Sequence, residues 1–81
     1  MKISEVPEKY KIYDIHLSNK DTFSITGEQK IALLKSKNSF VELQDGAIIN
    51  KNFIVDMMLN IDETRDSVIK HKPKILLDKL I

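Results

Sequence analysis

The sequence predicts an α+β fold in which a small antiparallel sheet packs against one or two helices. Three observations support this prediction. Short stretches of alternating apolar and polar residues, typical of half-buried strands, occur in both halves of the chain. An Asp-Gly pair between two such stretches favours a tight hairpin turn. A Thr-x-x-Gln helix start lies before this hairpin. The predicted order of elements is β-β-α-β-β-β-α, with the sheet facing the helices on one side.

Length and composition indicate one globular domain, residues 1–81. The chain has 13 basic and 12 acidic residues, a net charge of +1, and 42% hydrophobic residues. These values are typical of a soluble domain and unlike those of a disordered or membrane protein. Because the chain has no cysteine, disulfides and thiolate zinc sites cannot supplement a core of this size. Self-association remains available, so we expect a homodimer.

The first predicted hairpin follows a polar lead-in at residues 1–8. Residues 9–17 and 22–25 alternate in polarity, and the polar cluster at 18–21 is typical of a turn. The side chains expected on the common inner face are Tyr13, Ile15, Leu17, Phe23 and Ile25.

A helix is predicted to begin immediately after this hairpin. Thr26 and Gln29 have the spacing of a capping box, in which each side chain bonds to the backbone of the other residue. Asn38 is a suitable stop. The stripe expected to face the sheet consists of Ile31 and Leu34, with Ala32 and Leu33 at its edge.

A second hairpin is predicted over residues 39–50, with its turn at Asp45-Gly46. The residues expected to point inward are Val41 and Leu43 on the first arm and Ile48 or Ile49 on the second.

Residues 53–61 can be interpreted in two ways. As a strand, they place Val55, Met57, Leu59 and Ile61 on an inner face, opposite Ile54, Asp56, Met58 and Asn60. As a helix, they align Phe53, Met57 and Ile61. The alternation and the β-branched residues favour the strand.

The end of the chain is predicted to be an acidic turn followed by a basic helical segment. Residues 62–66 are read as the turn, and residues 67–81 as the helical segment, with a break at 70–73. Pro73 suits the first position of a final short helix. Its apolar face would contain Leu76, Leu77, Leu80 and Ile81.

Signatures of catalysis and of cofactor binding are lacking in the sequence. Gly27 and Gly46 are the only glycines, so the chain has no glycine-rich phosphate loop. A Ser/His/Asp triad could be assembled from His16, Asp14 and a nearby serine (Ser18 or Ser24), but the spacing carries no signature. We therefore expect no enzyme, no cofactor and no metal site.

Two binding functions are the main hypotheses, beside a minor one in which a dimer interface binds a small ligand. The first is protein binding through an exposed patch and the C-terminal helix. The residues expected to carry it are Ile54, Met58, Leu77, Leu80 and Ile81. The alternative is a nucleic-acid-binding regulator that uses the basic segment, through Lys70, Lys72, Lys74 and Lys79. Scarce arginine and the absence of aromatic residues from that segment weigh against the alternative.

The helix start at residues 25–29 and the stretch 40–54 (FVELQDGAIINKNFI) carry a resemblance that extends over about half of the chain. They resemble small uncharacterised proteins of phages and mobile elements of low-GC Gram-positive bacteria. The resemblance implies an accessory protein that acts by association with a host or phage protein. The N-terminus is polar and no apolar run could span a bilayer, so we expect no membrane partner and a location in the (host) cytoplasm.

Overall fold

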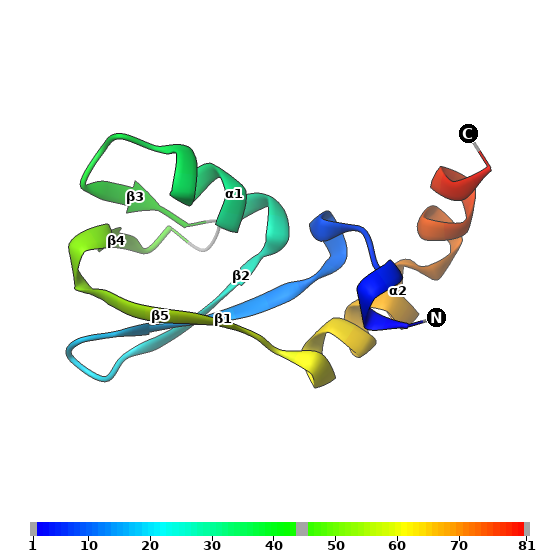
Figure 1. The fold of residues 1–81 in the computed structure, drawn as a ribbon, viewed down its shortest axis with the longest axis horizontal. Helices are drawn as coiled ribbons and strands as arrows, with labels where there is room; N and C mark the ends of the chain where they lie inside the picture. The colour runs from blue at the N-terminus through cyan, green and yellow to red at the C-terminus, as the bar shows by residue number, and fades with distance from the viewer. Residues whose placement is uncertain (1, 44–45, 81) are drawn as a thin grey trace.

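The computed structural model describes residues 2–43 and 46–80 and has the predicted α+β fold. Two antiparallel sheets and two helices follow one another in the order β-β-α-β-β-β-α (Figure 1). The strands and helices are β1 (Ile12–Leu17), β2 (Thr22–Thr26), α1 (Gly27–Lys35), β3 (Phe40–Glu42), β4 (Ile48–Asn50), β5 (Ile54–Leu59) and α2 (Ile61–Lys79). Three short 3-10 helices are η1 (Ile3–Glu5), η2 (Glu8–Tyr10) and η3 (Lys51–Phe53).

The main sheet has the strand order β2-β1-β5, with all pairs antiparallel. Tyr13 lies opposite Ile25 on one side and Leu59 on the other, while Ile15 lies between Phe23 and Met57. The strand interpretation is therefore confirmed for residues 54–59, whereas Phe53 belongs to η3 and Ile61, predicted to face inward, begins α2 and is exposed. The apolar face predicted for the first hairpin is confirmed as well.

A β-bulge in β5 overturns one part of the predicted face assignment. His16 pairs with Asp56, but the next residue, Leu17, pairs with Ile54, so Val55 is an extra residue in the ladder. The bulge turns Ile54 toward the core side, where it packs against the buried cluster, and leaves Val55 exposed. The predictions that Ile54 lies beside Met58 on the outer face and that Val55 faces inward are both wrong, because simple alternation assumes an unbroken ladder.

Helix α1 begins at the predicted capping box. The Thr26 hydroxyl accepts a hydrogen bond from the Gln29 backbone N–H (3.2 Å), and the Gln29 side chain accepts one from the Thr26 N–H (3.0 Å). The predicted stripe was wrong, since Leu33 is buried whereas Ile31 and Leu34 are exposed. The helix follows β2 without a loop, so this junction fixes which side faces the sheet.

The end of α1 also differs from the prediction. The helix stops at Lys35 instead of Asn38. The Lys51 ammonium donates hydrogen bonds to the backbone carbonyls of Leu33 and Ser36. A cation at this position satisfies carbonyls that the end of the helix leaves without intrahelical partners.

The second hairpin forms a separate two-stranded ribbon, β3–β4. Val41 pairs with Ile49, which is buried, while Ile48 points outward. The predicted hairpin is confirmed over these strands, and Ile49 is the inward partner. Gly46 has a positive φ of 88°, as a tight turn requires. Asp45 of the predicted turn lies outside the described residues.

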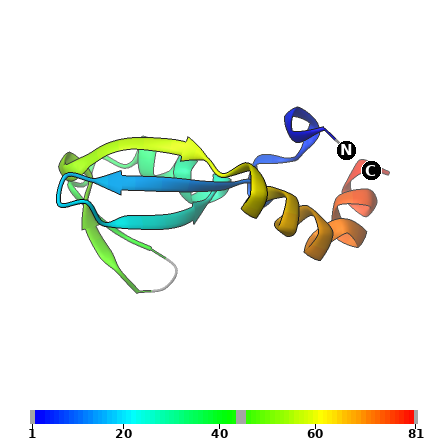
Figure 2. The same ribbon diagram turned by 90° about the horizontal axis from the view of Figure 1, so that it is seen from below.

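Helix α1 and the ribbon cover the same face of the main sheet (Figure 1). The other face of the sheet lies open toward the viewer in Figure 2. The buried residues between sheet, helix and ribbon are Ile15, Ile25, Leu33, Leu43 and Ile49. The sheet thus has one apolar and one polar face, as is common for antiparallel sheets.

Helix α2 begins earlier than predicted and is longer. Residues 62–66, predicted to be a turn, form its first turns. The Asn60 side chain accepts a hydrogen bond from the Glu63 N–H at 2.9 Å, which caps the helix. Acidic residues in a first turn also interact favourably with the helix dipole. The prediction failed because it read an acidic run as a turn and overlooked this cap.

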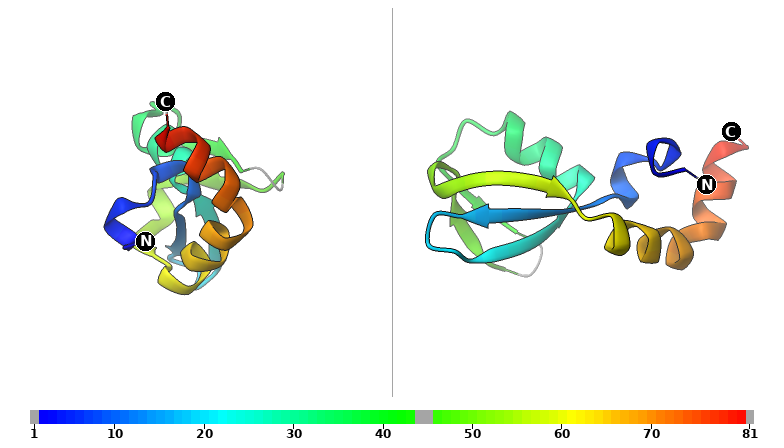
Figure 3. Two further views of the ribbon diagram at one scale, coloured as in Figure 1. Left: turned by 90° about the vertical axis from the view of Figure 1, so that its right-hand side faces the viewer. Right: turned by 60° about the horizontal axis from the view of Figure 1, so that its bottom comes forward.

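Pro73 lies inside α2 and does not start a new helix. The helix bends in its middle, and its second half turns away from the direction of the first (Figures 1 and 3). Proline is the usual cause of such a kink, because it lacks the N–H that would bond to the carbonyl of residue 69.

Helix α2 packs beyond the end of the main sheet and does not cover its second face (Figure 3). It contacts the N-terminal segment. Ile75 of α2 forms a second buried cluster with Val6 and Tyr10 of that segment, and Val68 of α2 lies at the edge of this cluster. The predicted polar lead-in therefore supplies part of a core. Two clusters placed end to end give the molecule its elongated shape, 40 × 23 × 21 Å.

The two parts are joined where α2 meets the start of β1. Thr64 is completely buried, and its hydroxyl accepts a hydrogen bond from the Ile12 N–H at 2.9 Å. The same hydroxyl lies 3.4 Å from the Ile12 carbonyl, to which it donates. The N–H of Asn60 bonds to that carbonyl as well, at 2.9 Å.

Candidate functional site

The outer side of α2 carries a row of exposed aliphatic side chains that continues to its C-cap, Leu80. Ile69, Leu76 and Leu80 are 74%, 48% and 83% exposed, and Leu77 beside them is 60% exposed. Together with Pro73, the first three follow the spacing i, i+4, i+7, i+11 of one side of a helix, with the bend at Pro73 between Ile69 and the other two (Figure 1). We call Ile69, Leu76, Leu77 and Leu80 the α2 stripe.

The opposite side of α2 is already used by the fold. Thr64 and Ile75 are completely buried, and Val68 packs against the cluster that contains Ile75. A surface helix ordinarily has one apolar side and one polar side. The inner side of α2 already packs against the rest of the chain. Folding alone therefore does not require its outer side to be apolar as well.

Lysines border the α2 stripe on both flanks. Lys72 comes directly before Pro73, and Lys79 directly before Leu80. Lys70 comes directly after Ile69, and Lys74 directly after Pro73. Successive residues are about 100° apart around a helix, so the two pairs lie on opposite flanks. All four side chains are exposed. The predicted nucleic-acid residues are therefore not gathered into one basic face.

A shallow apolar groove adjoins the stripe at Ile69. It lies between η1 and the first half of α2 and has a volume of about 260 Å³. The residues that line it are Ile3, Val6, Arg65, Val68 and Ile69. The stripe thus extends into a depression that could receive an apolar side chain of a partner.

The other residues of the predicted protein-binding set lie elsewhere. Met58 is exposed on the open face of the main sheet, and Ile54 packs toward the core. Leu77 and Leu80 belong to the α2 stripe. Ile81 lies outside the described residues. Sequence reasoning missed Ile69, although its spacing of seven and eleven residues from Leu76 and Leu80 is a signal that could have found it.

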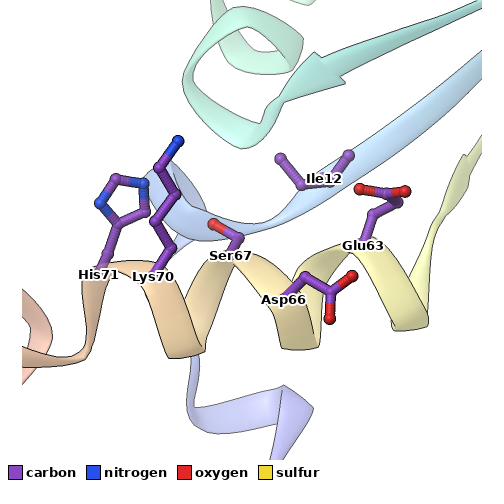
Figure 4. A pocket seen from close by; sticks show the side chains of 6 residues that line it. All are labelled: Ile12, Glu63, Asp66, Ser67, Lys70 and His71. Atoms are coloured by element: carbon purple, nitrogen blue, oxygen red, sulfur yellow. The ribbon is translucent and has the colours of Figure 1, made fainter.

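The close-up in Figure 4 shows a polar depression of about 250 Å³ on another side of α2. Glu63 and Asp66 lie at one end, Lys70 and His71 at the other, with Ser67 between them. Since its acidic groups lie at one end and its basic groups at the other (Figure 4), the depression as a whole does not offer a single charge to a ligand.

A neighbouring depression, of about 460 Å³, contains groups that interact with one another. Lys9 forms an ion pair with Asp78 at 2.9 Å, and the Tyr10 hydroxyl donates to Asp78 at 3.3 Å. The hydrogen bond from Lys9 lowers the pKa of the Asp78 carboxyl, and Asp78 in turn raises the pKa of Lys9. The Tyr10 ring lies 5.3 Å from that of His71. These contacts hold α2 on the N-terminal segment.

The open sheet face does not form the triad considered from the sequence. His16 pairs through Nδ1 with Asp56, whereas the Ser24 hydroxyl donates to Asp14 at 3.1 Å. Asn60 donates to the other Asp14 oxygen at 3.0 Å. The serine and the histidine are thus bonded to different carboxylates.

A polar network around Glu8 fixes the N-terminal segment to the main sheet and α1. Glu8 accepts hydrogen bonds from Lys11 at 3.0 Å and from the Tyr13 hydroxyl at 3.0 Å, and forms an ion pair with Lys30 at 3.2 Å. Partial burial disfavours the charged carboxylate, but these partners outweigh it and hold the pKa of Glu8 below its usual value. This network stabilises the fold.

Nowhere in the described part of the chain do three or more His, Cys, Asp or Glu side chains gather so that they could hold a metal ion. No helix among residues 2–43 and 46–80 is long and apolar enough to cross a membrane.

No protein-family model matches the chain, and neither a curated protein nor a solved structure gives a match. Function therefore has to be inferred from the surface of the described residues, where the α2 stripe is one of several groups of exposed apolar side chains.

Proposed function

We propose that the protein is a non-enzymatic protein-binding module that docks through the α2 stripe onto an apolar groove of a partner protein. The resemblance to small phage and mobile-element proteins supports an accessory role, exerted by association with a host or phage protein. One observation carries the proposal: α2 presents four exposed aliphatic side chains on one side although its other side is already buried.

The spacing of the stripe suits helix-in-groove recognition, in which anchors recur every three or four residues. Complete burial of a Leu or Ile side chain contributes roughly 1.5–3 kcal/mol. Four half-exposed or more exposed side chains therefore supply on the order of 5 kcal/mol before the cost of association. Because association itself costs about 4 kcal/mol or more, the stripe would bind a partner together with further contacts, such as one in the groove at Ile69.

The nucleic-acid alternative has less support. Phosphate contacts would use the lysines but would leave the apolar stripe in water. Lys70 and Lys74 also lie on the opposite flank from Lys72 and Lys79, so the four lysines do not form one basic face. Such binding would also weaken steeply with salt.

Affinity capture from a low-GC Gram-positive lysate tests the proposal with a matched pair of variants. Leu80→Asp places a charge in the stripe, and Leu34→Asp does so at a leucine that is 64% exposed on α1. We expect wild type and Leu34→Asp to retain one stoichiometric protein after nuclease treatment, and Leu80→Asp to lose it. Retention of that protein by Leu80→Asp would contradict the proposal, and capture abolished by nuclease would favour the alternative.

A further inference from the structure

We infer that the surface recognised by the α2 stripe is an apolar groove with acidic rims on both sides. This inference rests on the proposed function and specifies the chemistry of the partner. It follows from the positions of the lysines around the stripe. These positions are a separate observation from the solvent exposure of the aliphatic side chains.

The evidence is that cations flank the stripe on both sides. Lys72 and Lys79 border one flank, and Lys70 and Lys74 border the other. The only acidic residue between positions 67 and 80, Asp78, is engaged by Lys9 and Tyr10. When a helix enters a groove, lysine stems lie along the apolar wall while their ammonium groups reach the rim. Carboxylates on both rims would therefore complement this helix, and basic rims would repel it.

A second copy of the chain is a poor occupant of this face. A two-fold axis between antiparallel helices places each flank beside the same flank of the partner. Lys72 and Lys79 would then meet their own counterparts, together with Arg65, which lies seven residues before Lys72 on the same flank. The homodimer expected from chain length therefore has to use another face.

An anionic bilayer is also less suitable than a protein groove. Asp62 and Asp66 are exposed on the first half of α2, on the side that leads into the stripe. A negatively charged membrane surface would repel these carboxylates while it attracted the lysines. A protein groove can carry different charges at its two ends and so can complement both halves of the helix.

Two synthetic amphipathic helical peptides with identical leucine rows test the inference. Glu borders the leucine row in one peptide, and Lys borders it in the other. Binding to the full-length protein is measured by fluorescence anisotropy at about 50 and 300 mM salt. We expect at least about tenfold tighter binding of the Glu peptide at low salt, and a smaller preference at high salt because the ions screen the rim charges.

Charge reversal at the flanks provides the decisive comparison. The double variant Lys72→Glu/Lys79→Glu should lose the preference for the Glu peptide, while Lys20→Glu/Lys37→Glu, changed at exposed lysines away from α2, should keep it. Equal binding of both peptides, or binding of neither, would overturn the acidic-rim inference while leaving the lysate capture as a separate test of docking. A membrane would instead be the target if the wild-type protein sedimented with vesicles of anionic lipid, Leu80→Asp did not, and the two peptides bound equally.

Discussion

The Thr64→Val substitution tests whether one buried hydroxyl joins the two parts of the molecule. Thr64 is completely buried, and its hydroxyl bonds to both backbone groups of Ile12. Valine has nearly the same shape, so the substitution leaves no cavity and removes only the hydrogen bonds. Any loss of stability can then be assigned to those bonds.

The magnitude follows from which groups lose their partner. The Ile12 carbonyl keeps its hydrogen bond from the Asn60 N–H, so only the Ile12 N–H is left without its acceptor. A partly buried donor without a partner costs about 1–2 kcal/mol. For a domain of this size, 1 kcal/mol corresponds to roughly 4–8 °C in Tm, so we expect a decrease of about 5–15 °C.

Urea unfolding followed by circular dichroism measures the effect, with Thr22→Val as the control. Thr22 is exposed on β2, where the same change should alter the free energy of unfolding by less than about 0.5 kcal/mol. If Thr64→Val and Thr22→Val unfolded at the same urea concentration as wild type, the assigned role of the hydroxyl would be refuted.

Four further variants concern the N-terminal segment, the turn before β4 and the stripe. Gly27→Ala would place a Cβ 1.9 Å from the Glu8 carbonyl oxygen, so it should destabilise by about 2 kcal/mol or more in urea unfolding. Gly46→Ala meets no atom within 4 Å and should lose only about 1 kcal/mol through its positive φ. Because the pKa of Glu8 is lowered in the folded state, its contribution to stability is present above the unfolded pKa, near 4.5, and is lost as the pH falls. Glu8→Gln should therefore flatten the dependence of Tm on pH between 7 and 3, and an unchanged slope would contradict this. Leu80→Asp should change the free energy of unfolding by less than about 0.5 kcal/mol, since Leu80 is almost fully exposed; a large loss in urea unfolding would show that the stripe has a structural role.

Elements encoded by neighbouring residues were predictable from the sequence. The capping box of Thr26 and Gln29 and the two hairpins depend on contacts a few residues apart, and the structure confirms them. The cap at Asn60 was equally local, with Glu63 three residues later, and should have revealed the true start of α2.

Features that depend on distant parts of the chain were not predictable in this way. The bulge at Val55 arises where β5 meets β1, so alternation within β5 alone misplaces Ile54. The burial of Leu33 depends on how α1 lies on the sheet. The candidate site has the same limitation, because the outer side of α2 can be recognised only when its inner side is known.

The end-to-end placement of the two clusters has a consequence for the order of folding. The cluster around Ile15 includes the local β1–β2 hairpin as well as the distant β1–β5 pairing, but its contacts are shorter in sequence than those between the N-terminal segment and α2, so it can close earlier. The contacts between the N-terminal segment and α2 span most of the chain, as in the Tyr10–Asp78 hydrogen bond between residues 68 positions apart. Closing such a long loop carries the larger entropy cost and slows folding. The part of the molecule that presents the stripe should therefore form last and be the first to open in hydrogen exchange.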